Sequence, residues 1–167
     1  MRRRQALKMI CDTELLCNPV FILYVLAISI GHSGFMATCF FTPLYTNELW
    51  GSESLNAALI SMMGVSDLIG RIMGGVIADM GLMPKPYLVS ISFTICSVMV
   101  LLMPFIPKMG AIFTCAILFG LVGGSYLSML VVIIIELFGE PKLPIGLGLT
   151  TLSMGLMIIP IPPTFGE

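Results

Sequence analysis

The sequence predicts an all-α membrane protein with about five transmembrane helices. Of its 167 residues, 57% are hydrophobic and only 10% are charged, and the mean hydropathy is +1.05. Soluble domains carry about 25% charged residues, so this composition excludes an ordinary soluble protein. The apolar residues also gather in five segments, and each segment is long enough for a helix to cross a bilayer, which takes at least about 17 residues.

The expected spans alternate with short polar turns. A cytosolic N-terminal segment over residues 1–18 is expected to precede a helical bundle over residues 19–163, and residues 164–167 are expected to form a short external tail. The spans are placed at about 19–45, 55–79, 87–106, 111–138 and 145–161.

The first expected span contains a polar cluster. Ser29, His32 and Ser33 lie among glycines, and such groups are tolerated in a membrane where other helices or water satisfy them. We therefore expect this span to line a cavity. No carboxylate or cysteine cluster accompanies His32 at a metal-ligand spacing, so we interpret it as a packed or pore-facing side chain. A polar loop at 46–54 is expected to follow, with Trp50 as an interfacial anchor.

The second expected span carries an acid and a base near its middle. Asp67 and Arg71 are four residues apart, so on a helix they lie one turn from each other and can form an ion pair. Gly75 and Asp79 continue the same stripe. A charge at bilayer depth costs at least about 2.5 to 3.5 kcal/mol, and such residues normally face a bundle interior or a watery cavity. The pattern favours a functional pair, and a purely structural lock between helices is the alternative.

Small residues form a second stripe beside the charged one. Ser66, Gly70, Gly74 and Ala78 recur every four residues and would let a neighbouring helix approach closely. A similar seam in the fourth expected span consists of Gly120, Gly124 and Ser128. We interpret both seams as helix-packing surfaces.

The remaining spans carry few chemical groups. The third contains no charge, so we expect it to serve packing. The fourth ends near Glu136, which we interpret as an interfacial residue, and a role in closing a gate is left open. The fifth is rich in glycine and threonine and is followed almost at once by the end of the chain.

Basic residues set the expected orientation. If the N-terminus is cytosolic, only Lys108 among the basic residues outside the spans lies on the external side. The basic residues then on the cytosolic side are Arg2, Arg3, Arg4, Lys8, Lys85 and Lys142. This positive-inside bias predicts a cytosolic N-terminus and an external C-terminus.

Several classes of function are not expected. No basic face could hold phosphates, so we do not expect nucleic-acid binding. The five cysteines lack CxxC spacing, and we interpret them as buried thiols rather than disulfides or metal ligands. No metal site or cofactor site is expected. An enzyme is not expected either, because no nucleophile with a base and no pair of catalytic acids can be assembled from these residues.

At this point a resemblance to a known family can be stated. The run AALISMMGVSDLIGRIMGGVIAD, with NPVFILYVLAISIGHSGFMATCFFTPLY before it and GLGLTTLSMGLMIIPIPP after it, resembles the C-terminal half of monocarboxylate transporters in the major facilitator superfamily. The resemblance covers about residues 18–163, and its most specific part is the pattern of Asp67, Gly70 and Arg71. It implies helices seven to eleven of a twelve-helix fold built from two six-helix halves, and therefore a truncated chain.

The resemblance also implies a function. It implies proton-linked transport of short monocarboxylates such as lactate or pyruvate across the plasma membrane. The family's arginine associated with the substrate carboxylate maps onto Arg71, and its acid associated with proton coupling maps onto Asp67. The segment GGVIADMGLMPKP, which includes Gly75, resembles the superfamily's cytosolic loop motif, with Asp79 in place of its acid but Met80 where an arginine should follow. A single-span accessory glycoprotein, needed by several family members, is a candidate partner.

The charges alone suggest how such a pair could work. Arg71 keeps its proton and presents a planar fork that suits a carboxylate. With Asp67 ionised the pair is neutral, so an arriving anion leaves an excess negative charge that protonation of Asp67 would remove. Two alternatives stay open. One is a superfamily carrier of another organic solute, such as an amino acid or a drug-like anion. The other is a non-transporting truncated subunit that associates with partners through exposed small-residue seams.

Overall fold

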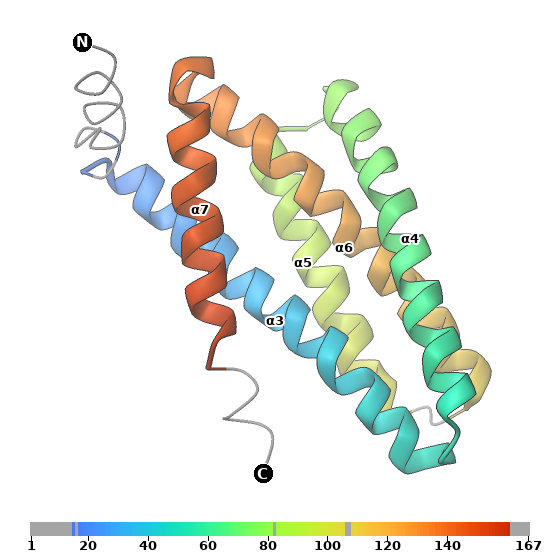
Figure 1. The fold of residues 1–167 in the computed structure, drawn as a ribbon. Helices are drawn as coiled ribbons and strands as arrows, with labels where there is room; N and C mark the ends of the chain where they lie inside the picture. Colours follow the sequence, from blue (N-terminus) through green and yellow to red (C-terminus); the bar gives the residue numbers. More distant parts are fainter. Residues whose placement is uncertain (1–14, 16, 82, 106–107, 161–167) are drawn as a thin grey trace. The chain divides into compact units, whose positions relative to one another are not determined.

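The regular structure of the chain is helical throughout its described part. The computed structural model describes residue 15 and residues 17–81, 83–105 and 108–160. Its helices are α3 (Pro19–Trp50), α4 (Glu53–Asp79), α5 (Lys85–Leu102), α6 (Met109–Phe138) and α7 (Leu143–Ile158), with 3-10 turns η1 (Met103–Phe105) and η2 (Glu140–Lys142) (Figure 1). The predicted all-α class is confirmed. Most of the expected cytosolic segment at 1–18 and the whole expected tail at 164–167 lie outside the described residues.

Four helices in the described part of the chain are long and apolar enough to cross a membrane. They are α3, α4, α5 together with η1, and α6. The fifth, α7, has 16 residues and lies over the last expected span. Large apolar side chains are exposed along these helices, for example Leu23, Ile72 and Leu101. An exposed apolar surface of this kind suits contact with lipid rather than water, so the chain is an integral membrane protein.

The described chain forms two compact units, and the first contains α7. It consists of the described residues up to Ala37 and from Ile134 onward. Ser29 on α3 donates a hydrogen bond from Oγ to Oγ of Ser153 on α7 at 2.9 Å. His32 is 8% exposed, and its ring stacks on Phe35 at 6.4 Å between centroids. In this unit His32 therefore matches the packed alternative.

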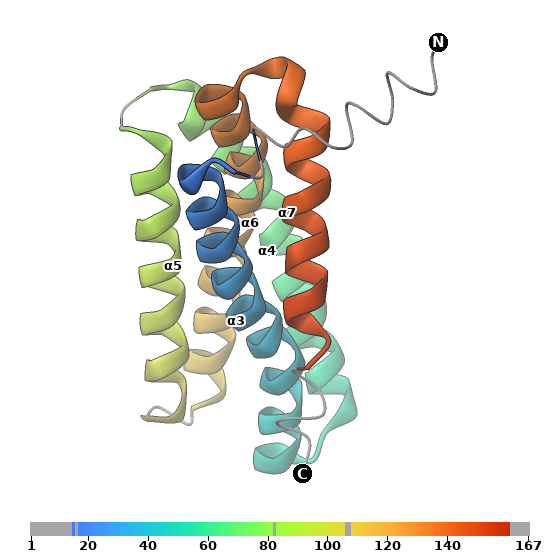
Figure 2. The same cartoon turned by 90° about the vertical axis from the view of Figure 1, so that its left-hand side faces the viewer.

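The second unit runs from Thr38 to Ile133 and contains α4, α5 and most of α6. These three helices run in alternating directions (Figure 1), and α5 and α6 lie alongside each other (Figure 2). The Phe93 ring of α5 lies 4.7 Å from the fully buried Tyr126 ring of α6, centroid to centroid. The uncharged third span thus packs against α6 through an aromatic pair.

The polar stretch at 46–54 is mostly helical, so the expected loop there is wrong. Helix α3 continues to Trp50 and α4 begins at Glu53, which leaves two residues between them. Gly51 makes this turn with a φ of +59°, a left-handed conformation that glycine adopts without steric cost. A turn at this glycine therefore connects α3 to α4, where a longer loop was expected.

Side-chain hydrogen bonds explain why polar residues continue the helix there. Thr46 Oγ1 donates to Asn56 Oδ1 at 2.7 Å, and Asn56 Nδ2 donates to Asn47 Oδ1 at 3.1 Å. The two helices therefore satisfy each other's polar groups. Polar composition alone suggested a solvated loop because it does not show that these side chains have partners on the next helix.

Candidate functional site

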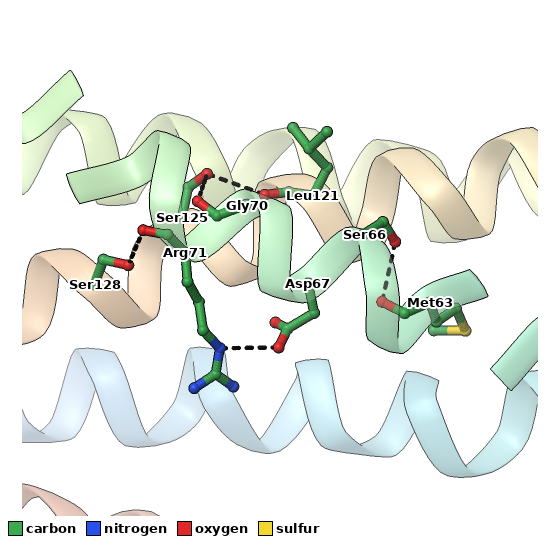
Figure 3. A network of polar contacts seen from close by, with 8 residues as sticks. All are labelled: Met63, Ser66, Asp67, Gly70, Arg71, Leu121, Ser125 and Ser128. Carbon is green, nitrogen blue, oxygen red and sulfur yellow. Dashed lines mark hydrogen bonds and ion pairs between the residues drawn. The ribbon is translucent and has the colours of Figure 1, made fainter. Parts of the chain in front are cut away.

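The predicted ion pair forms on α4. Arg71 donates from Nε to Oδ2 of Asp67 at 2.9 Å (Figure 3). The Arg71 side chain is 52% exposed and that of Asp67 is 21% exposed. Within the described residues, the terminal nitrogens of Arg71 have no hydrogen-bond partner. Asp67 Oδ1 is buried and, in the same part of the chain, also lacks a partner.

The charged stripe stays outside the buried core along its whole length. Gly75 is half-buried, and a Cβ built on it would meet no atom within 4 Å. Asp79 is exposed and is the last residue of α4. Asp67 and Arg71 are thus brought together, whereas Gly75 and Asp79 lie one and two turns further along and contact neither side chain in any described interaction.

The small stripe of α4 is buried against α6. A Cβ on Gly70 would overlap the backbone oxygen of Leu121, and one on Gly74 would lie 2.5 Å from Ser125 Cα. Only a residue without a side chain fits where two backbones approach this closely. All four members of the stripe, Ser66, Gly70, Gly74 and Ala78, are buried.

The seam of α6 supplies the other half of this contact. A Cβ on Gly120 would lie 2.6 Å from the backbone oxygen of Met63. One on Gly124 would overlap the backbone oxygen of Asp67 and lie 2.9 Å from the backbone nitrogen of Arg71. The structure therefore brings the two seams together at one helix crossing, directly behind the charged pair.

Two serines of α6 complete the crossing with hydrogen bonds (Figure 3). Ser128 donates from Oγ to the backbone oxygen of Arg71 at 2.6 Å. Ser125 donates from Oγ to the backbone oxygen of Gly70 at 3.1 Å and, within its own helix, to that of Leu121 at 3.0 Å. The sequence interpretation treated Ser128 only as a small residue and missed Ser125. A serine within or beside a glycine seam of an apolar helix is the signal that could have found them.

These contacts correct one expectation. The alternative of an associating subunit assumed that the small-residue seams are exposed. The α4 stripe is buried, and Gly120 and Gly124 are buried opposite it. The seams are filled within this chain, so they do not supply a free surface for another protein.

The thiols and potential metal ligands offer no second site within the described residues. No group of three or more His, Cys, Asp or Glu side chains there could hold a metal ion. The expectation of buried thiols is right for Cys96, but Cys39 and Cys115 are half-buried and Cys17 is exposed. Cys17 differs because it precedes the first long helix. Cys11 lies outside the described residues.

Comparisons with known proteins agree with the helical architecture. The profile of the Major Facilitator Superfamily matches residues 3–162. Monocarboxylate transporter 2 of Meriones unguiculatus is 28% identical over 165 residues, which cover 98% of this chain and 34% of the relative. Monocarboxylate transporter 13 of Rattus norvegicus is 28% identical over 138 residues, or 82% of this chain and 32% of the relative. No solved structure matches the chain significantly.

A third relative shows the same partial coverage. Monocarboxylate transporter 10 of Homo sapiens is 29% identical over 126 residues, which make up 73% of this chain and 24% of the relative. The chain thus spans about a third or less of the length of these relatives. The superfamily profile, by contrast, covers nearly the whole chain, and helices long and apolar enough to cross a membrane make up most of the described part of that range. The chain belongs to the Major Facilitator Superfamily.

Proposed function

We propose that this chain contributes second-half helices to a carrier that moves short monocarboxylates, of the lactate or pyruvate type, together with a proton. Arg71 binds the substrate carboxylate and Asp67 carries the proton. One observation supports this most strongly. The Arg71 guanidinium is held at Nε by Asp67, while its side chain is half exposed and its terminal nitrogens have no partner within the described residues.

The geometry of Arg71 suits an end-on approach by a carboxylate. Guanidinium and carboxylate groups pair through two parallel N–H···O bonds, which add geometric specificity to the charge attraction. Because Asp67 occupies only Nε, the two terminal nitrogens remain in one plane for such a pair. A monocarboxylate offers one such group, and Arg71, the one arginine among the described residues, supports a site for a single carboxylate.

The geometry of Asp67 suits a proton carrier. Its Oδ2 accepts the hydrogen bond from Arg71, and its Oδ1 is buried and unpartnered within the described residues. A buried, unpartnered carboxylate oxygen is costly as an anion. When a substrate anion joins the pair, the excess negative charge is removed by a proton on Asp67, for which Oδ1 is the available atom. The anion and the proton are then transported together, with no net charge.

The wider setting of the carrier also belongs to the proposal. The distribution of basic residues favours a cytosolic N-terminus, and the plasma membrane is the proposed location. A single-span accessory glycoprotein is the proposed partner for delivery to the surface. Asp79 and Gly75 are proposed to act in the cytosolic loop that closes the carrier on that side. The names of the relatives say only that they are monocarboxylate transporters, so this wider setting rests on the basic residues and on the resemblance of the sequence to that family.

Uptake of labelled lactate tests the proposed function. Cells would express the 167-residue chain alone, or a fused carrier in which this chain lies between the first six helices and the last helix of monocarboxylate transporter 2. We expect the fused carrier to take up lactate faster at acidic than at neutral external pH, because a proton accompanies each anion. Surface biotinylation measures how much protein reaches the plasma membrane.

The controls separate the substrate assignment from the fold. The first six helices expressed alone give the background, since they lack Arg71 and Asp67. Absence of uptake above this background by both forms, with both at the surface, contradicts the monocarboxylate assignment. A labelled amino acid in the same cells tests the other organic-solute alternative.

A further inference from the structure

We propose that Ser128 is a positioning residue for the substrate-binding arginine, because its hydroxyl holds the backbone of Arg71 from the neighbouring helix. The inference rests on the proposed function of Arg71. It assigns to α6 a task beyond packing: fixing the place from which the guanidinium extends.

The hydroxyl of Ser128 donates to another helix, as those of Ser29 and Ser125 also do, but unlike Ser125 it does not also donate within its own helix. Serine and threonine hydroxyls in helices commonly donate to a carbonyl one turn earlier in their own helix. Ser61 on α4 does so to Ala57, and Thr114 on α6 does so to Gly110. The Ser128 hydroxyl instead donates to the backbone oxygen of Arg71 on another helix at 2.6 Å, and within the described residues this hydroxyl makes no other hydrogen bond.

The Arg71 carbonyl can accept this bond without losing its helical partner. In an α-helix each carbonyl accepts the N–H four residues later, here that of Gly75, and a carbonyl oxygen has a second lone pair. Ser128 uses that second position. A Cβ built on Gly75 would meet no atom within 4 Å, so the bond from Ser128 adds to the backbone contacts that Gly74 and Gly124 make at this turn.

A second contact holds the other side of the same residue. Gly124 lies one turn before Ser128 on α6, and a Cβ there would reach the Asp67 carbonyl and come within 2.9 Å of the Arg71 nitrogen. The α6 backbone therefore rests against the peptide hydrogen bond that joins Asp67 to Arg71. Both peptide groups of Arg71 are in contact with α6, while its side chain extends toward Asp67 (Figure 3).

This arrangement predicts an effect on substrate binding rather than on folding. Bidentate pairing depends on the direction of the guanidinium plane, and a small rotation of the Arg71 backbone moves the end of this long side chain. Removing one hydroxyl leaves the glycine contacts of the crossing intact. We therefore expect α4 and α6 to stay packed, while the Arg71 backbone, from which the guanidinium extends, is held less firmly.

Lactate uptake by the fused carrier is the first test. We expect Ser128→Ala to raise KM about fivefold, as loss of one hydrogen bond implies, with surface amount and maximal rate within about twofold. Ser128→Thr, which keeps a hydroxyl, is expected to restore KM. Ser61→Ala on α4 is the matched control, since its hydroxyl bonds only within its own helix. An unchanged KM in Ser128→Ala, or no recovery in Ser128→Thr, overturns the inference.

A second test does not depend on transport. In membranes containing the 167-residue chain, Arg71→Cys is labelled with a water-soluble methanethiosulfonate, and mass spectrometry follows the modified peptide, so the native cysteines can remain. We expect adding Ser128→Ala to change the labelling rate at position 71 at least about threefold, as loss of a backbone anchor implies, whereas adding Ser61→Ala leaves it unchanged. An equal rate in both double variants overturns the inference.

The two tests separate the two proposals. Absence of uptake in the fused carrier overturns the proposed function, yet the labelling rate still decides whether Ser128 positions residue 71. Normal uptake with an unaltered KM and labelling rate in Ser128→Ala leaves the proposed function standing and removes Ser128 from it.

Discussion

Two neighbouring stripes of α4 face different surroundings. Ser66, Gly70, Gly74 and Ala78 are buried at every position and lie against the backbone of α6. None of the residues one position further along, Asp67, Arg71, Gly75 and Asp79, is buried. A rotation of one residue around the helix thus separates a packing surface from a charged one. The close approach of α6 on one side fixes the helix that presents the charges on the other.

Substitutions of Gly70 and Gly75 should show the largest difference between the two stripes. Leucine at position 70 would have to enter the space of the Leu121 backbone, whereas position 75 has open space around it. We expect Gly70→Leu to destabilise the chain by about 3 kcal/mol or more, because a backbone cannot yield as a side chain can. Gly75→Leu is expected to fold normally. The check is size-exclusion behaviour and thermal unfolding of the detergent-purified chain, and equal stability of the two variants would contradict the division between stripes.

The next largest effect is expected on the charged stripe. Arg71→Lys keeps the charge but replaces the planar fork with a point charge. Loss of a charged bidentate hydrogen bond predicts a fall in lactate uptake of about tenfold to hundredfold, without loss of folded protein. Uptake normalised to surface amount in the fused carrier measures it. Full activity in the lysine variant would show that Arg71 does not bind the substrate carboxylate through a bidentate pair.

A smaller effect on rate, but a distinct one on pH dependence, is expected at Asp67. Protonation of Asp67 neutralises the loaded site, so acid outside should speed uptake by the unaltered carrier. Asp67→Asn is neutral at every pH and can still accept the bond from Arg71 through its amide oxygen. We expect the ratio of uptake at acidic to neutral pH to fall to about one, since the variant binds no proton there. Acid stimulation that persists in this variant would remove Asp67 as the proton carrier.

Periodicity was enough to predict the stripes but not their partners. The four-residue spacing of small residues and the spacing of Asp67 and Arg71 follow from helical geometry, so the all-α class, both seams and the ion pair could be expected from the sequence. Spacing within one helix does not show which other helix it meets. The α4 seam and the α6 seam were both visible, but their mutual contact emerged only from the arrangement of α4 and α6 in space.

Hydrogen bonds between helices could not be predicted from the sequence, for a related reason. Ser128 and Ser29 look like small polar residues in apolar segments, and their default acceptors lie in their own helices. Their actual partners are Arg71 and Ser153, which lie far away in the sequence. The helical course of the polar stretch at 46–54 was missed in the same way, because the partner Asn56 belongs to the next helix.

The smallest expected effect would sharpen the comparison within the charged stripe itself. Gly75→Ala adds one methyl group where no atom lies within 4 Å, and alanine favours a helix over glycine by up to about 1 kcal/mol. We expect thermal stability of the chain to be unchanged or slightly raised. If Gly75 acts in closing the carrier, lactate uptake should fall while stability does not, because a stiffer turn beside Arg71 resists movement. A stability loss like that of Gly70→Leu would mean that position 75 is a packing position after all.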